Sequence, residues 1–161
     1  MYKIKIYSVG KTKEPWLQEA LALYEMRLKG ALTLEWLLYK TTAQLEDALK
    51  KEGPFLCLTS EATQYTSPEF SSSFIRWITQ CGSRLSFVIG GAEGLSEELK
   101  AQALSLFSLS KMTFTHQLSR LILVEQLYRA LEIAKGSLYH KISAANAASS
   151  ERSVRSKKIC P

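Results

Sequence analysis

Three consecutive polar residues near the end of the sequence, Tyr139, His140 and Lys141, could take part in chemistry on a nucleic acid. A tyrosine ring can stack on a base, while histidine and lysine can contact phosphate or exchange protons. They can also be incidental polar residues at the frayed end of a helix. Taken alone, the residues favour this simpler interpretation.

A second set of polar residues lies in the segment HQLSRLILVEQLYRA, 116–130. His116 stands at the junction with a long apolar stretch, where a structural or solvent-facing histidine is also a common finding. Glu125 and Arg129 are four positions apart, so they can form an ion pair on one face of a helix. Arg120 adds a further cation to an otherwise apolar segment.

The segment FVIGGAEGLSEE, 87–98, connects an apolar run to a helix-forming stretch through three glycines. It lacks the G-x-G-x-x-G of dinucleotide sites, and no G-K-[ST] follows it. Glycines allow a ligand to approach the backbone closely, and N–H groups at the helix start near Ser96 could donate to that ligand. Glu93 disfavours a phosphate and favours a neutral or cationic ligand. A plain strand-to-helix turn would use the same residues.

The segment SLSKMTFT, 108–115, carries four hydroxyl side chains. We expect a fifth strand or an extended loop here, which should reach the same edge of a sheet as the glycine loop. Its hydroxyls and backbone could then contribute to one common site.

An alternation of strands and helices is expected to position these residues. Apolar periodicity predicts strands at 2–9, 32–39, 55–59 and 84–90, and helices at 15–29, 42–52, 67–80, 96–106 and 117–135. In the third helix, Ser67 is the expected cap. This order is typical of one parallel α/β sheet with helices on both faces. A ligand should lie beyond the carboxyl ends of the strands, in the loops after Val9, Thr59, Ile89 and Phe114. The first of these loops includes a basic turn, 10–13.

The composition of the 161-residue chain is that of one ordinary domain, with 46% hydrophobic and 22% charged residues. Its apolar runs are too short to span a membrane, and the alternating N-terminus lacks the apolar core of a signal peptide, so we expect a cytoplasmic protein. The three cysteines, Cys57, Cys81 and Cys160, have no C-x-x-C spacing, so neither a disulfide framework nor a metal site is expected.

The chain divides into an expected domain, 1–141, and a basic tail, 142–161, whose small polar composition predicts disorder. The net charge is +6, and the tail contributes Arg152, Arg155, Lys157 and Lys158 against Glu151 alone. The segment 117–135 is apolar most of the way round, which predicts a second packing partner besides the sheet. A second subunit would supply that partner.

Four ordered motifs, FVIGGAEGLS, SLSKMT, HQLSRLILVEQLYRA and YHK, closely resemble the RlmH (YbeA) family. These are SPOUT-class methyltransferases that act on large-subunit ribosomal RNA. The resemblance runs from the first strand to Lys141. It implies a deep C-terminal trefoil knot, a homodimer, and S-adenosylmethionine as methyl donor without a metal. The implied product is a pseudouridine methylated at N3, in the assembled ribosome.

The resemblance also implies roles for individual residues. The donor pocket would be formed by Leu58, Gly90, Gly91, Leu109, Ser110, Lys111, Met112, Thr113 and Phe114. The acceptor nitrogen must lose a proton before it attacks the methyl carbon, so a base or anion-stabilising groups are needed. The candidates are His116 and His140, with Arg129 and Lys141 as electrostatic support and Tyr139 beside them. In a dimer, one subunit's terminus could complete the other's site.

The sequence departs from the family pattern at three places. Thr115 and Gln117 replace the prolines that usually flank the histidine, and Thr59 and Ala62 stand where the family has an aspartate and a glycine. The basic tail is additional, and it could either obstruct the site or contact RNA phosphates. These departures keep one alternative open, a non-catalytic ribosome-binding or assembly factor that retains the fold. A nucleotide-dependent oxidoreductase would rest on the glycine loop alone.

Overall fold

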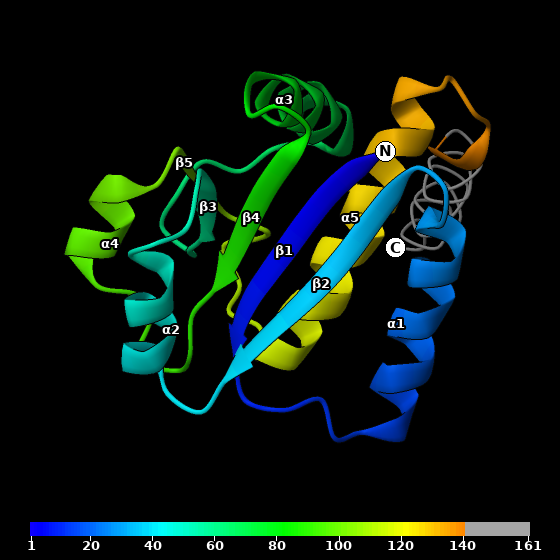
Figure 1. The fold of residues 1–161 in the computed structure, drawn as a ribbon. Helices are drawn as coiled ribbons and strands as arrows, with labels where there is room; N and C mark the ends of the chain where they lie inside the picture. Colours follow the sequence, from blue (N-terminus) through cyan, green and yellow to red (C-terminus); the bar gives the residue numbers. More distant parts are fainter. Residues whose placement is uncertain (141–161) are drawn as a thin grey trace, which may run out of the picture.

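The structure is a computed structural model that describes residues 1–140. Five parallel strands form one sheet in the order β2-β1-β4-β3-β5 (Figure 1). The strands are β1 (Tyr2–Val9), β2 (Leu32–Tyr39), β3 (Phe55–Leu58), β4 (Arg84–Ile89) and β5 (Ser105–Phe107). The helices are α1 (Pro15–Leu28), α2 (Thr42–Leu49), α3 (Ser67–Gln80), α4 (Glu97–Gln102) and α5 (His116–Ala134). The predicted parallel α/β class is confirmed.

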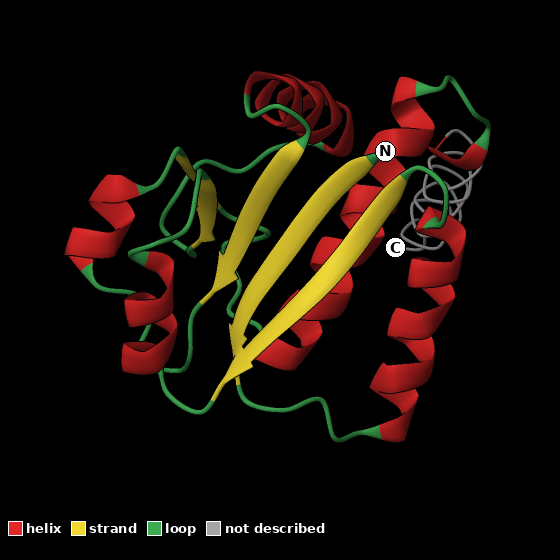
Figure 2. Ribbon diagram, in the orientation of Figure 1, coloured by secondary structure: helices red, strands yellow, loops and turns green. Residues whose placement is uncertain are grey.

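Helices cover both faces of the sheet, as Figure 2 shows. α1, α3 and α5 pack on one face against alternate strand residues such as Ile4, Ile6 and Phe87. α2 and α4 pack on the other face, against Tyr7 and Val88. Because strand side chains alternate between faces, one apolar strand can serve both layers. No helix in the described part of the chain is long and apolar enough to cross a membrane.

The end of the sheet differs from the prediction. α4 ends at Gln102, four residues before the expected 106, and the fifth strand is Ser105–Phe107. The segment 108–115 is therefore a loop, which is the second of its two expected forms, and the fifth strand lies just before it. Phe107 is buried against the rings of Phe70 and Phe87, at centroid distances of 5.5 and 5.9 Å. That packing and the pairing with β3 define the strand, and neither is visible in a local pattern.

The capping residues of α3 and α5 each lie one residue earlier than the sequence pattern suggests. Thr66, one residue before the predicted cap Ser67, caps α3 in a reciprocal capping box with Glu69. Thr115 caps α5, because its hydroxyl accepts a hydrogen bond from the Leu118 N–H at 3.3 Å. α5 therefore begins at His116, one residue before the predicted start at 117.

Candidate active site

Four loops meet at the carboxyl edge of the sheet, at the lower end of the molecule in Figure 1. Ser8 and Leu58 both lie opposite Ile89, and Leu58 also lies opposite Phe107. The chain leaves the sheet after Leu58 and Phe107, instead of after Thr59 and Phe114 as predicted. The register brings Leu58, Gly90 and the start of the 108–115 loop to one edge, as expected for a ligand site in this class of fold.

The glycines of the 90–94 loop are required by the loop's own packing. A Cβ at Gly90 would lie 3.0 Å from Leu95 Cγ, and one at Gly91 would lie 3.1 Å from the Thr42 hydroxyl. Gly94 has a φ of +76°, which L residues rarely adopt, and its N–H donates to the Gly91 carbonyl. The Glu93 carboxylate folds back to 3.3 Å from the same Cβ position at Gly91. The neighbouring Thr42 hydroxyl lowers the pKa of this exposed carboxyl, so the loop carries a negative charge at neutral pH.

The start of α4 is closed to a ligand by a side chain of α2. The Ser96 N–H and hydroxyl donate to the two carboxylate oxygens of Glu46, at 2.8 and 2.9 Å. The expectation that N–H groups at Ser96 face a ligand is therefore wrong for Ser96 itself. Glu46 is 50 positions away in sequence, so no local pattern indicates this contact.

Hydrogen bonds within the 108–115 loop determine its shape. The buried Ser108 hydroxyl donates to the Ser110 carbonyl at 2.8 Å, and the Ser110 hydroxyl accepts from the Met112 N–H at 3.0 Å. Lys111, Met112 and Thr113 are exposed at the turn of the loop. Two of the predicted hydroxyls thus stabilise the loop, and the rest of its surface remains accessible.

His116 lies against the β1–α1 loop. Its Nε2 atom is 3.0 Å from where a Cβ on Gly10 would be, so only glycine fits there without movement. Burial and the adjacent Arg120 charge lower the pKa of His116, and Glu14 opposes them. The imidazole is therefore mainly neutral at pH 7.

Arg120 has contacts that its place in the sequence does not predict. Its side chain is fully buried, and its guanidinium donates to the Ser8 and Thr12 hydroxyls and to the Val9 and Gly10 carbonyls. Its spacing from Leu123, Val124 and Leu127 places it on the buried stripe of α5. The position of a cation among apolar residues at helical spacing is the one feature of the sequence that indicates specific partners for Arg120.

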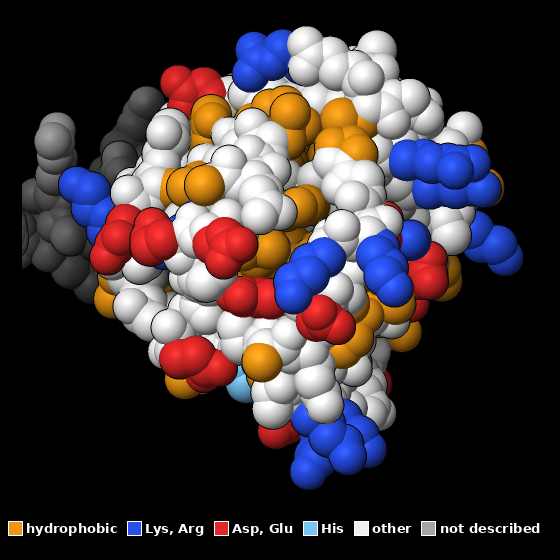
Figure 3. Space-filling model, turned by 60° about the vertical axis from the view of Figure 1, so that its left-hand side comes forward, with side chains coloured by type: hydrophobic (Ala, Val, Ile, Leu, Met, Phe, Trp, Pro, Cys, Tyr) orange, Lys and Arg blue, Asp and Glu red, His pale blue; other side chains and the backbone are white. Residues whose placement is uncertain are grey.

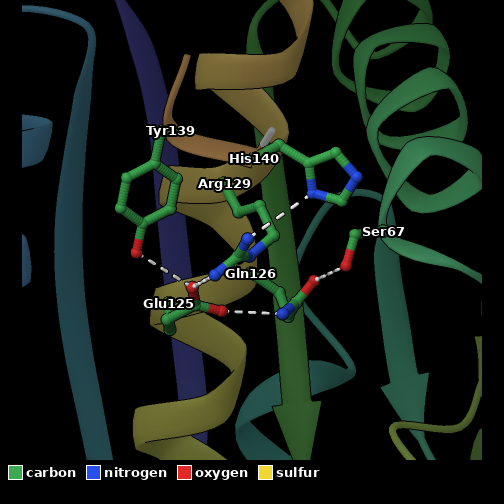
Figure 4. A network of polar contacts seen from close by, with 6 residues as sticks. All are labelled: Ser67, Glu125, Gln126, Arg129, Tyr139 and His140. Carbon is green, nitrogen blue, oxygen red and sulfur yellow. Dashed lines mark hydrogen bonds and ion pairs between the residues drawn. The ribbon is translucent and has the colours of Figure 1, made fainter. Parts of the chain in front are cut away.

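A polar network forms along the middle of α5 and the turn that follows it (Figure 4). Glu125 Oε1 accepts hydrogen bonds from Arg129 Nε at 3.0 Å, Arg129 Nη2 at 2.6 Å and the Tyr139 hydroxyl at 3.1 Å. Arg129 Nη1 lies 3.5 Å from His140 Nδ1. The other carboxylate oxygen, Glu125 Oε2, accepts a hydrogen bond from the Gln126 side-chain amide. The amide oxygen of Gln126 in turn accepts a hydrogen bond from the Ser67 hydroxyl of α3. The predicted Glu125–Arg129 ion pair is confirmed.

Aromatic contacts hold the same network in place. The Arg129 guanidinium carbon lies 4.7 Å from the centre of the Tyr139 ring, and the Tyr128 ring meets Tyr139 edge-on at 4.9 Å. Burial, reinforced by the charge of Glu125, raises the pKa of Tyr139, so its hydroxyl stays protonated and acts as a donor. The structure therefore brings together Tyr139, His140 and Arg129. Lys141 lies outside the described residues.

The two histidines that could act as bases lie toward opposite ends of α5. Arg129, next to His140, follows His116 by 13 positions, or roughly 20 Å along a helix axis. Within one chain, the carboxyl-edge loops and the His140 network are thus separate. Among residues 1–140 there is also no cluster of three or more His, Cys, Asp or Glu residues that could hold a metal ion.

Comparison with known proteins gives the family. Residues 2–140 match the sequence model described as predicted SPOUT methyltransferase. The chain belongs to the SPOUT methyltransferase family. Two of its relatives are proteins named ribosomal RNA large subunit methyltransferase H. The one from Protochlamydia amoebophila is 51% identical over 141 residues, covering 88% of this chain and 100% of the relative. The other, from Prochlorococcus marinus, is 40% identical over 143 residues, covering 86% of this chain and 96% of the relative.

Among solved structures, TrmJ from Z. mobilis aligns with a TM-score of 0.46 and 10% identity, over 80% of this chain and 69% of TrmJ. The assignment to the SPOUT methyltransferase family rests on the sequence match, which includes all ten described strands and helices.

Proposed function

We propose that this SPOUT methyltransferase transfers a methyl group from S-adenosylmethionine to N3 of a pseudouridine in large-subunit ribosomal RNA, within the assembled ribosome in the cytoplasm. The observation that carries the proposal is the 51% identity with a relative named for that class of RNA, over that relative's whole length. The motifs that resemble the RlmH family lie within the matched region, up to His140.

The donor would be held at the carboxyl edge by Leu58, Gly90, Gly91 and the loop 109–114. The chemistry of this edge fits it, because the Glu93 carboxylate favours a sulfonium cation and no phosphate-binding loop is present. When bound, S-adenosylmethionine supplies an electrophilic methyl group. The residues of the turn 111–113 are exposed, so such a ligand can approach them.

The acceptor would be positioned by the network around Glu125. This carboxylate holds Arg129 and Tyr139, and Arg129 places a fixed positive charge beside His140. A fixed cation next to the acceptor would stabilise the anion that forms as the acceptor nitrogen loses its proton. His140 would contact the acceptor and either take the proton or orient the base. The neutral His116, at the other end of α5, is a candidate for the donor side.

A homodimer would bring the two halves of the site together. Leu118, Ile122, Glu125 and Arg129 share one stripe of α5, and Leu118 at its start is 40% exposed. The neighbouring α1 exposes Leu23 and Met26, which are 41% and 65% accessible. A second copy packed on these apolar side chains of α1 and α5 would also cover the stripe of α5 that carries Glu125 and Arg129. The C-terminal residues of one subunit could then face the donor loops of the other.

The proposal includes the trefoil knot of the SPOUT class. β5 lies at one edge of the sheet, yet the start of α5 contacts the end of β1, which lies beyond β3 and β4. The loop 108–115 makes this crossing along the carboxyl edge. This path is compatible with a chain end threaded through a loop. Such a knot would also fix the positions of the segments that are proposed to bind the donor.

A transfer assay tests the proposed function. Intact ribosomes that lack the modification would be incubated with the full chain and methyl-labelled S-adenosylmethionine, and the large-subunit RNA would then be digested and analysed. Label in a single methylated pseudouridine is the expected result. A chain that binds ribosomes but transfers no label would instead support the non-catalytic alternative.

A further inference from the structure

A buried arginine fixes a surface loop in this fold. Burying a cation is costly unless hydrogen bonds compensate for the lost water. Arg120 is 0% exposed, and its guanidinium donates to β1 and to the loop that follows, at Ser8, Val9, Gly10 and Thr12. Its charge persists in spite of burial, since a guanidinium does not deprotonate in proteins.

The loop is also held from other sides. The Gln18 side chain donates to the Thr12 carbonyl at 2.9 Å, and the Gly10 N–H donates to the Tyr39 carbonyl at 2.8 Å. His116 packs against Gly10, whose φ is +82°. The segment between β1 and α1 has no regular secondary structure. Its position is nevertheless fixed, because both the side chain and the backbone carbonyl of Thr12 accept hydrogen bonds.

The residues on either side of Thr12 are exposed lysines. Lys11 and Lys13 form no ion pair with any residue in the range 1–140, and Trp16, just beyond them, is 51% exposed. Figure 3 shows basic side chains that project from the lower end of the molecule, where the carboxyl edge lies. Ser8, just before this loop, lies opposite Ile89, just before the glycine loop. Two cations are therefore presented next to the proposed donor site.

We infer that the loop 10–14, fixed by Arg120, binds the phosphate backbone of the RNA next to the target nucleotide through Lys11 and Lys13. This inference rests on the proposed function. A fixed loop suits this role because less conformational freedom is lost on binding. The exposed indole of Trp16 beside the two cations favours RNA over an acidic protein surface, because aromatic rings also stack on bases.

The salt dependence of ribosome binding tests the inference. Each phosphate contact contributes about 0.7 to 0.9 to the slope of log affinity against log salt, so the K11Q/K13Q double variant should lower that slope by roughly 1.5. Donor affinity should be unchanged, because neither lysine belongs to the donor pocket. The matched control is K29Q/K51Q, which removes the same charge from two exposed lysines that likewise form no ion pair with residues 1–140, one just after α1 and one between α2 and β3. The control should keep the wild-type slope.

A cross-link identifies the partner. With a photoreactive benzoylphenylalanine in place of Lys13, illumination of the ribosome complex should give an adduct with large-subunit RNA. An adduct with a ribosomal protein only, or none, would overturn the inference, as would a K11Q/K13Q slope equal to that of the control. If the unaltered chain transfers no methyl group, the proposed function fails first. If the unaltered chain is active but K11Q/K13Q does not change the salt dependence of ribosome binding, only this inference is refuted.

Discussion

At the scale of single residues, the acceptor side of the proposed reaction depends on one carboxylate. Glu125 holds Arg129 and Tyr139 through the same oxygen, and Arg129 lies beside His140. The side chains of this network come from α5, from α3 and from the turn after α5 (Figure 4). Their geometry is therefore fixed before any ligand binds, which is what electrostatic stabilisation of an anion requires.

Replacement of His140 should affect turnover and leave the donor in place. We expect H140Q to slow methyl transfer by roughly 10²- to 10⁴-fold, the usual contribution of a positioned acid–base group. Its donor affinity, measured by calorimetry, should stay within about twofold, because His140 is assigned to the acceptor and the donor is held by Leu58 and the loops 90–91 and 109–114. H116Q provides the comparison. A larger loss of turnover in H116Q than in H140Q would show that the roles of the two histidines are assigned wrongly.

His116 should make stability depend on pH. Its pKa is lowered in the folded state, so the unfolded chain binds a proton first as the pH falls below about 6.5. Folding stability is therefore lost as the pH drops from about 6.5 through the folded-state pKa. The H116Q variant lacks this loss. The free energy of unfolding of H116Q minus that of the wild type should therefore be larger at pH 5 than at pH 7.5. Urea unfolding at both pH values measures the difference, and equal differences at both would contradict the assignment.

At the scale of elements, the sequence predicted most helices and strands because their apolar periodicity is strong. β1, β2, α1 and α3 lie where the pattern placed them. β5 was misplaced because a strand of three residues is defined by its neighbours β3 and Phe70. The Arg120 contacts and the Glu46–Ser96 contact join residues about 50 to 112 positions apart, so spacing alone does not reveal them.

The glycine loop gives a prediction at this scale. G91A would place a methyl group 3.1 Å from the Thr42 hydroxyl and 3.3 Å from Glu93, so the loop must shift. We expect donor affinity to fall about tenfold, equivalent to about 1.4 kcal/mol. G53A is the matched control, since a Cβ there meets nothing within 4 Å. Equal donor affinities of the two variants in calorimetry would show that the 90–94 loop is not part of the donor pocket.

At the scale of the whole molecule, activity should require two subunits. In L118E, an unpaired carboxylate would be buried at the proposed interface, a cost of several kcal/mol, so the dimer should dissociate at least about 100-fold more readily. Light scattering should find the wild type at twice the monomer mass and the variant as a monomer that no longer methylates ribosomes. L104E, at a position 46% exposed between α4 and β5, is the control. A monomeric L118E chain with full activity would exclude a shared site.

The proposed function is the transfer of a methyl group to a pseudouridine in large-subunit ribosomal RNA. Mass spectrometry of that RNA, from cells with and without the gene, tests it most directly. One pseudouridine should carry a methyl group at N3 when the gene is present and lack it when the gene is deleted, and the intact gene should restore it. Identical modification patterns in both strains would contradict the proposed function.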